Sequence, residues 1–346
     1  MKRTIVLLAA TAAALAAAPA ASAQVSLDDG QTKLTLNKGT VAALTHLGVS
    51  VRPTGPATLD GRNARFPVVG GEIDPATAAG KFAHRGGLRL KAANIKVKLD
   101  NYIVKVGSKI TLSARINGGK RATILNLTGT PKVTRDGFGT KVSGLTAKLN
   151  KTAARTLNKA YGVTAFKKGL KLGKVRTSLV PSDTELLPEG ATSLALAPAA
   201  LQAIVAQGIT PGVIGPATLA GTTASFPITG GLVALDLSAA EVSHSGGISL
   251  TKGATVVRLT DFDIVVGGSG APQLFATLNG GATPVAIIDL DLSALTPAID
   301  GRNVTLSGIT AKLTQGAADA LNAAFGTTAF AGGLVLGQAT VNAVGK

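Results

Sequence analysis

One long stretch occurs twice in this chain, and the duplication constrains the fold more than any other feature. The first copy reads FPVVGGEIDPATAAGKFAHRGGLRL from Phe66, and the second reads FPITGGLVALDLSAAEVSHSGGISL from Phe226. Phe-Pro, Gly-Gly and His-x-Gly-Gly therefore return in register, and a GPATL match precedes each copy at Gly55 and Gly215. A period of about 160 residues that occurs only twice indicates two tandem domains and not a solenoid.

The N-terminal segment, residues 1–23, is typical of a secretory signal peptide. Lys2 and Arg3 precede an apolar run, and Ala-Ser-Ala ending at Ala23 is a small-x-small cleavage site. No later stretch approaches the roughly 20 apolar residues that a membrane-spanning helix needs. We therefore predict a soluble mature protein, secreted to the exterior or associated with the cell envelope.

A proline-bearing segment separates the two copies. It reads LVPSDTELLPE, with two prolines and three acidic residues. Such polar segments commonly mark domain boundaries. The sequence thus predicts a first β domain at residues 24–180, a linker at 181–189 and a second β domain at 190–346.

The residue composition favours strands. The chain has no Cys, so neither disulfides nor thiolate chemistry is available to it. Val, Ile, Leu, Thr and Gly are abundant, which suits short strands joined by tight turns. We predict an all-β fold, mainly an antiparallel sandwich or barrel-like sheet, with two short helices in each domain.

Capping residues and periodicity mark those helices. Asn150 and Thr314 are suited to cap the runs KTAARTLNKAY and QGAADALNAAF, and Gly162 and Gly326 are suited to end them. A shorter helix is expected earlier in each repeat, in NKGTVAALTHLG, where Asn37 is the expected cap, and in APAALQAIVAQG. We expect the helices to cover an end of a sheet.

Charge is distributed unevenly between the repeats. Residues 25–184 contain 28 basic and 8 acidic residues, a balance of +20, whereas residues 185–346 contain 5 and 10, a balance of −5. In LRLKAANIKVKL, which begins at Leu88, alternation predicts that Leu and Val side chains and Ile95 face a core. The cations expected to face outward are Arg89, Lys91, Lys96 and Lys98.

Two interpretations of this basic face remain open. One is a solvated surface that also guards against edge-to-edge strand pairing. The other is attraction to a polyanion, such as an anionic cell-wall polymer or a lipid surface. Nucleic acid is not an expected partner, because the protein is predicted to be exported and no aromatic residues alternate with the cations for base stacking.

The order of motifs resembles the Htaa domain family, named for haem-transport-associated surface proteins of actinobacteria. The resemblance covers nearly all of both repeats and rests on Phe-Pro-x-x-Gly-Gly, His-x-Gly-Gly and a Leu-Thr-Ala-Lys-Leu strand leading into an Ala-rich helix. It implies a secreted or surface-exposed β-sandwich-like domain that takes up haem. It also implies an iron-ligating Tyr near the first helix, supported by the His of His-x-Gly, which corresponds to His84 and His244. The segments that correspond to the Tyr region, 35–56 and 195–216, contain no Tyr, Trp or Phe.

The three histidines are the candidate haem-contacting residues. His84 and His244 recur beside a Gly-Gly turn, where a histidine either contacts a ligand or hydrogen-bonds the backbone and holds the turn. His46 lies in the segment where the family carries its Tyr, and imidazole is a known haem ligand. The alternative for His46 is an exposed residue at a helix end.

No catalytic motif is present, so we predict that the protein is not an enzyme. The chain has no Gly-x-Ser-x-Gly, His-Glu-x-x-His or phosphate-binding loop. Asp261 with Asp263, and Asp289 with Asp291, are more simply explained as alternate residues on a strand face than as calcium ligands. The predicted function is binding of haem or a related hydrophobic ligand. The alternative is an envelope module whose basic first domain binds anionic wall polymer or lipid.

Overall fold

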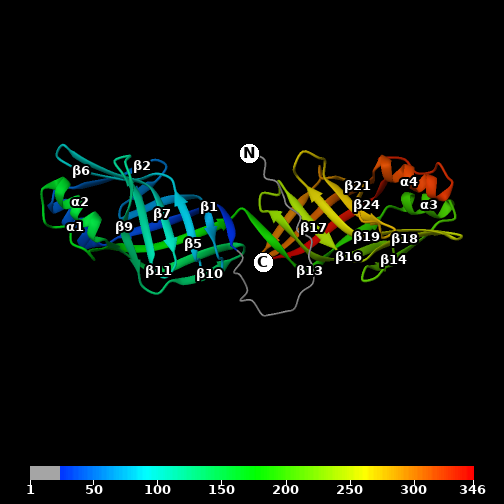
Figure 1. Ribbon diagram of the computed structural model, residues 1–346, viewed down its shortest axis with the longest axis horizontal. Coiled ribbons are helices and arrows are strands. Elements are labelled where there is room, and N and C mark those ends of the chain that lie inside the picture. Colours follow the sequence, from blue (N-terminus) through cyan, green and yellow to red (C-terminus); the bar gives the residue numbers. More distant parts are fainter. Residues whose placement is uncertain (1–23) are drawn as a thin grey trace.

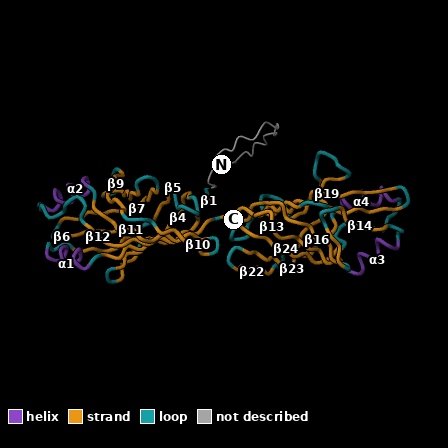
Figure 2. The backbone as a smooth tube through the Cα atoms, turned by 90° about the horizontal axis from the view of Figure 1, so that it is seen from below, coloured by secondary structure: helices purple, strands orange, loops and turns teal. Residues whose placement is uncertain are grey.

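The computed structural model describes residues 24–346, and the predicted signal peptide lies outside them. The described chain forms two β domains arranged end to end (Figures 1 and 2). The elements of the first domain are β1 Val25–Leu36, α1 Lys38–His46, β2 Ser50–Thr54, β3 Thr58–Asp60, β4 Asn63–Ile73, β5 Gly80–His84, β6 Gly87–Ala92, β7 Ile95–Val106, β8 Ile110–Ile116, β9 Arg121–Thr128, β10 Lys132–Asp136, β11 Gly139–Leu149, α2 Lys151–Tyr161 and β12 Lys171–Pro181.

The second domain repeats this order of elements. They are β13 Asp183–Leu196, α3 Pro198–Ala206, β14 Thr210–Ile214, β15 Thr218–Ala220, β16 Thr223–Ala234, β17 Ala240–His244, β18 Gly247–Lys252, β19 Thr255–Val266, β20 Gln273–Leu278, β21 Val285–Asp291, β22 Thr296–Asp300, β23 Asn303–Leu313, α4 Gln315–Phe325 and β24 Val335–Gly345.

Each domain is a closed antiparallel barrel of eight strands. In the first, the strands follow the order β7-β5-β4-β1-β12-β11-β9-β8, and β8 pairs again with β7. β6 and β2 extend outward from β7, while β3 and β10 pair with β4 and β11. In the second domain the strands follow the corresponding order β19-β17-β16-β13-β24-β23-β21-β20, and β20 pairs again with β19. The predicted all-β, barrel-like tandem fold is confirmed.

Alternating side chains fill the barrels. In β4, for example, Ala64, Phe66 and Val68 are buried and the residues between them are not. The first domain has one continuous apolar cluster that extends from the barrel to α2, whereas buried apolar residues of the second domain fall into two clusters. None of the helices in residues 24–346 has the length and hydropathy that crossing a membrane requires.

The repeated motifs occur together because they pack on one another. The peptide N–H of Arg85 donates to Pro67 O (3.1 Å), which joins His-x-Gly-Gly to Phe-Pro. At Gly86, φ is +78°, and a Cβ would lie 2.6 Å from Ala57 N in the GPATL turn. Only glycine combines this backbone conformation with so close an approach. Gly246 has the same role in the second repeat, with φ of +84°.

The longer helix of each domain begins and ends where the sequence predicts. The Asn150 side chain accepts from Ala153 N (2.7 Å) and Thr314 Oγ1 accepts from Ala317 N (3.1 Å), while Gly162 and Gly326 adopt the left-handed conformation. Asn37 occupies the predicted N-cap position of α1, but its side chain makes no capping hydrogen bond and instead donates to the backbone oxygen of Lys171 (3.1 Å).

The two barrels are joined without a loop. Residues 181–189, predicted as a linker, lie at the end of β12 and in β13, with only Ser182 between the two strands. Ser182 N donates to Ser26 O of the first domain, and Ser182 O accepts from Leu235 N of the second, both at 2.9 Å. Pro188 is tolerated because it lies at an irregularity in both strand pairings of β13.

Candidate functional site

A cavity of about 650 Å³ lies inside the first barrel, toward the end that α1 and α2 cover (Figure 1). Its walls come from the inward faces of the barrel strands and from both helices. Typical lining residues are Leu34, Leu88, Val97, Leu112, Leu125 and Leu157. The surface inside is almost entirely apolar.

The cavity opens between α1 and the segment that connects α2 to β12. Gly39 and Ala43 of α1, Ala165 and Lys171 line the cavity and are exposed to solvent. The start of α1 is fixed at this opening because Thr40 Oγ1 donates to Lys171 O (2.9 Å), as does the Asn37 side chain. We refer to these four exposed lining residues as the mouth.

The lining offers little that could ligate a metal. Among the described residues that line the cavity there is no His, Met or Cys, and Tyr102 alone has a side chain known to bind haem iron. Tyr102 Oη accepts from Leu88 N (3.1 Å), and burial raises the pKa of this phenol far above its ordinary value. Because iron ligation by Tyr uses the phenolate, the cavity fits an apolar ligand and does not fit a preformed haem-iron site.

His84 is part of the barrel wall and does not line the cavity. It is 3% exposed, and Nδ1 lies 3.3 Å from Tyr102 O. Because a carbonyl only accepts, Nδ1 donates and Nε2 accepts the Thr32 hydroxyl (2.7 Å). Thr177 Oγ1 lies 3.0 Å from Thr32 Oγ1 and completes the chain of hydrogen bonds.

His244 repeats this arrangement with one member missing. Nδ1 lies 2.9 Å from Phe262 O, and Nε2 lies 2.6 Å from Thr192 Oγ1. Val341 is opposite Thr192 in the strand pairing, so the second repeat has no counterpart of the Thr177 hydroxyl there. Both ring nitrogens of each histidine are thus engaged with the protein, as expected for a histidine that holds the turn.

Burial keeps both histidines neutral. Desolvation lowers the pKa of His84 from 6.5 to about 4, against the opposing effect of its hydrogen bond to Tyr102 O. Desolvation also lowers the pKa of His244, against the hydrogen bond to Phe262 O and the charge of Asp263. A neutral imidazole with both nitrogens in use has no lone pair available for a ligand.

His46 is exposed at the end of α1 and is outside the lining of the cavity. The three predicted histidines are therefore not brought together. His84 and His244 belong to different barrels, and His46 is at a helix end, where the alternative interpretation expected it.

The predicted basic residues do share one surface. Arg89 and Lys91 of β6 lie directly opposite Lys98 and Lys96 of β7, and all except the half-buried Lys98 are exposed. The prediction that Ile95 faces the core is wrong, because it begins β7 at the tip of this hairpin and is 40% exposed.

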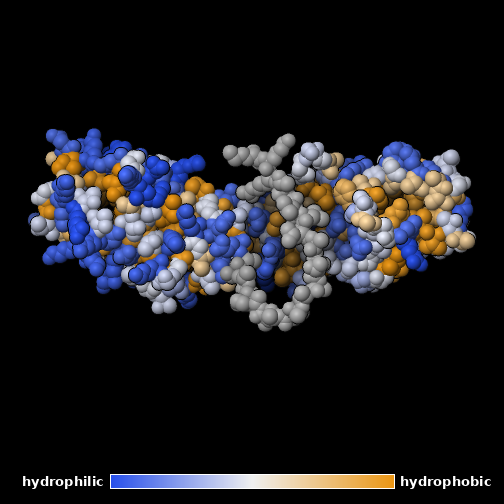
Figure 3. All heavy atoms as spheres, in the orientation of Figure 1, coloured by the Kyte–Doolittle hydropathy of each residue, from blue (hydrophilic) through white to orange (hydrophobic). Residues whose placement is uncertain are grey.

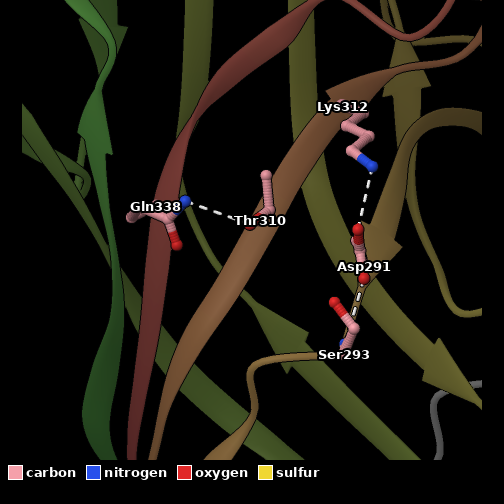
Figure 4. Close-up of polar contacts among 5 residues, drawn as sticks. All are labelled: Asp291, Ser293, Thr310, Lys312 and Gln338. Carbon is pink, nitrogen blue, oxygen red and sulfur yellow. Dashed lines mark hydrogen bonds and ion pairs between the residues drawn. The ribbon is translucent and has the colours of Figure 1, made fainter.

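The paired aspartates of the second domain have protein partners. Asp291 accepts from Lys312 Nζ (2.8 Å) and from Ser293 N (3.0 Å), contacts that lower its pKa (Figure 4). Asp289 accepts from Gln273 Nε2 (2.9 Å). Within residues 24–346 there is no group of three or more His, Cys, Asp or Glu side chains that could hold a metal ion.

Fold and cavity together define a tandem-barrel protein with an apolar pocket in its first domain. Among solved structures, the C-terminal domain of HtaA from Corynebacterium glutamicum matches with a TM-score of 0.37 and 12% identity, over 45% of this chain and 98% of that domain. A histidine-to-alanine variant of the same domain, a domain-swapped dimer, matches with a TM-score of 0.31 and 14% identity, over 42% of this chain and 94% of the other. No family model and no curated protein matches the chain.

Sequence reasoning missed the cavity. Its lining residues are Leu, Val and Ala at alternate strand positions, and in sequence these are indistinguishable from residues that fill a core. The one feature of the sequence that points to an opening is the pair of small residues Gly39 and Ala43 in the first helix, beside these apolar strands.

Proposed function

We propose that the mature chain is an exported, non-catalytic binding protein whose first domain takes up a hydrophobic ligand in the barrel cavity. The observation that carries this proposal is the apolar cavity of about 650 Å³ with a solvent-facing mouth. Ligand pockets in proteins typically enclose about 300–1,000 Å³ and are lined mostly by apolar side chains. The N-terminal segment 1–23, with its signal-peptide pattern, supports export.

The ligand class follows from the lining. Apolar contacts supply the affinity, because each Å² of apolar surface removed from water contributes about 25 cal/mol. Haem belongs to this class through its porphyrin, and it would be held here by ring packing and without a histidine ligand. Long aliphatic chains would make the same kind of apolar contact with the lining of the cavity.

The test is a titration of the mature protein with two probes, haemin followed by visible absorption and a fluorescent polyene fatty acid followed by emission. Ala43→Phe places a ring in the mouth, at an exposed position where it leaves the core unchanged. The matched control is Ala203→Phe, at the aligned position of α3 in the second domain. We expect Ala43→Phe to weaken probe binding at least about tenfold and Ala203→Phe to leave it unchanged.

His84→Ala and His244→Ala test whether a histidine contacts bound haem. Because neither ring reaches the cavity, we expect the haemin spectrum of the bound state to be the same in both variants as in the parent. Saturable binding that Ala43→Phe does not weaken would contradict the proposed site. A haemin spectrum that changes only in a histidine variant would instead restore a histidine to the haem site.

A further inference from the structure

The cavity of the first domain is closed on one side by a small three-stranded sheet. It consists of β2, β6 and the first part of β7, residues 50–54, 87–92 and 95–99, and we call it the flap. Its inward side chains line the cavity: Val51, Leu88, Leu90, Val97 and Leu99. Because strand side chains alternate, the residues between them form the outer face of the same sheet.

That outer face carries basic residues in cross-strand rows. Arg52 lies opposite Arg89, which in turn lies opposite Lys98, and Lys91 lies opposite Lys96. The face continues around the barrel, where Arg115 of β8 lies opposite Arg121 of β9. In Figure 3 strongly hydrophilic residues gather over the end of the first domain that carries β6.

Few of these charges are neutralised by the protein. Lys98 pairs with Asp100 (2.5 Å), but within residues 24–346 the exposed side chains of Arg52, Arg89, Lys91 and Lys96 form no ion pair. Like charges directly opposite one another destabilise a sheet. The rows therefore cost stability in the isolated chain, a cost that an anionic partner removes.

Edge protection does not account for all of these cations. Among the flap strands, β2 is an edge and residues 95–98 of β7 pair only with β6, but Arg89 and Lys91 lie on β6, which is paired on both sides. In the second domain the aligned rows are Gly212–Ser249–Arg258 and Thr251–Val256, with the same strand pairing and a single cation. The shared scaffold therefore forms without these cations.

The tip of the flap distinguishes a lipid surface from a soluble polyanion. Ile95 is 40% exposed at the β6–β7 turn, between Asn94 and Lys96. In the second domain the aligned residue is Thr255, and the neighbouring Val256 is also 40% exposed, but it lies opposite Thr251 and not among cations. An exposed apolar side chain among cations suits the boundary between anionic headgroups and acyl chains, and a hydrated polymer offers it nothing.

We propose that the flap is a docking surface for anionic lipid membranes, with its cationic rows on the headgroups and Ile95 at the acyl boundary. This adds a surface to the proposed ligand site and is independent of the identity of the ligand. It places a sheet whose other face lines the apolar cavity directly on a membrane.

The experiment is cosedimentation of the mature protein with phosphatidylcholine vesicles that contain or lack phosphatidylglycerol, across a sodium chloride series. The flap variant combines Arg89→Ser, Lys91→Thr and Lys96→Thr. The control removes the same charge elsewhere in this domain, by Lys105→Gln, Lys109→Gln and Lys132→Gln. Ile95→Thr tests the tip, and the fatty-acid titration in solution shows whether each variant keeps its ligand site.

We expect binding only to anionic vesicles, weakened by salt. Each flap cation contributes roughly fivefold, so the flap variant should bind on the order of a hundredfold more weakly, the control much less so, and Ile95→Thr a few-fold more weakly. Fatty-acid binding in solution should be unchanged in all of them. Equal losses of vesicle binding in the flap and control variants would overturn the proposal. Polyphosphate serves as a soluble polyanion for comparison. Unchanged vesicle binding in Ile95→Thr, together with binding of the parent to polyphosphate as tight as to anionic vesicles, would also overturn it.

Discussion

The two barrels share their interior and differ at their surfaces. Phe66 and Tyr102 meet edge to face with ring centroids 5.0 Å apart, and Phe226 and Phe262 do the same at 4.9 Å. Each barrel also has its buried histidine bonded to a threonine and a carbonyl. By contrast, net charge changes from +20 in residues 25–184 to −5 in residues 185–346. The scaffold thus fixes buried polar contacts and leaves the exterior free to acquire a separate role.

The helix-covered ends also differ. In the second domain Thr327 Oγ1 donates to Gln207 Oε1 (2.7 Å), which ties the end of α3 to the segment after α4. The first domain has Leu47 at the position of Gln207, and Leu47 lines the cavity. The same position is thus part of the apolar cavity wall in the first domain and part of a polar bridge in the second.

The largest expected stability effect comes from removing the histidines. Alanine at His84 or His244 leaves a cavity and frees buried hydrogen-bonding groups, at a cost of about 3 kcal/mol of unfolding free energy in its own domain. The loss should be larger for His244→Ala, because Thr192 then keeps no side-chain partner, while Thr32 keeps Thr177. Urea unfolding with domain-resolved hydrogen exchange measures both, and equal losses would show that Thr177 contributes nothing.

Acid should destabilise the first domain through His84. Because its folded pKa is about 4 and its ordinary value is 6.5, the unfolded chain binds a proton that the folded chain does not in the interval between them. Stability should therefore fall as pH decreases from about 6.5 to about 4, by up to about 3 kcal/mol. Hydrogen exchange across this interval in the parent and in His84→Gln tests this, and the same pH slope in both would contradict it.

Removing the N-cap side chain of the longer helix should cost the same stability in both repeats. Asn150→Ala and Thr314→Ala each remove a side-chain acceptor from a first-turn peptide N–H, and each should cost about 1 kcal/mol. Local hydrogen exchange of α2 and α4 provides the measurement. A loss confined to one helix would show that its cap is supported by tertiary contacts that the other lacks.

The smallest effect is expected from making the first repeat resemble the second. Thr177→Val removes the outermost hydroxyl of the His84 chain and introduces the residue found at Val341, at a cost of about 0.5 kcal/mol. Thermal unfolding of this variant beside His84→Ala gives the comparison. A loss as large as that of His84→Ala would mean that the three side chains act as one cooperative unit.

Features determined by neighbouring residues could be predicted from the sequence. The caps at Asn150 and Thr314 and the glycine ends of both helices depend on a few adjacent residues. The duplication indicated two tandem domains, and the abundance of Val, Ile, Leu, Thr and Gly indicated the antiparallel barrel-like class.

Features determined by contacts between distant residues could not be predicted from the sequence. Closure of the barrel depends on the pairing of β1 with β12, the first and last strands of the domain, which no local pattern records. Ile95 follows the alternation of its strand yet is exposed, because the hairpin tip extends beyond the core. Likewise, a histidine beside Gly-Gly is compatible with a ligand or a structural role until Thr32 is seen against its ring.

The junction at Ser182 has a consequence for how the molecule meets its surroundings. Because β12 passes into β13 almost without interruption, the helices of the two domains lie at opposite ends of the molecule (Figures 1 and 2). The mouth of the first barrel thus faces away from the corresponding end of the second. The molecule is therefore elongated with a helix-covered end at each pole, and the two ends of one molecule are too far apart to contact the same small molecule at once.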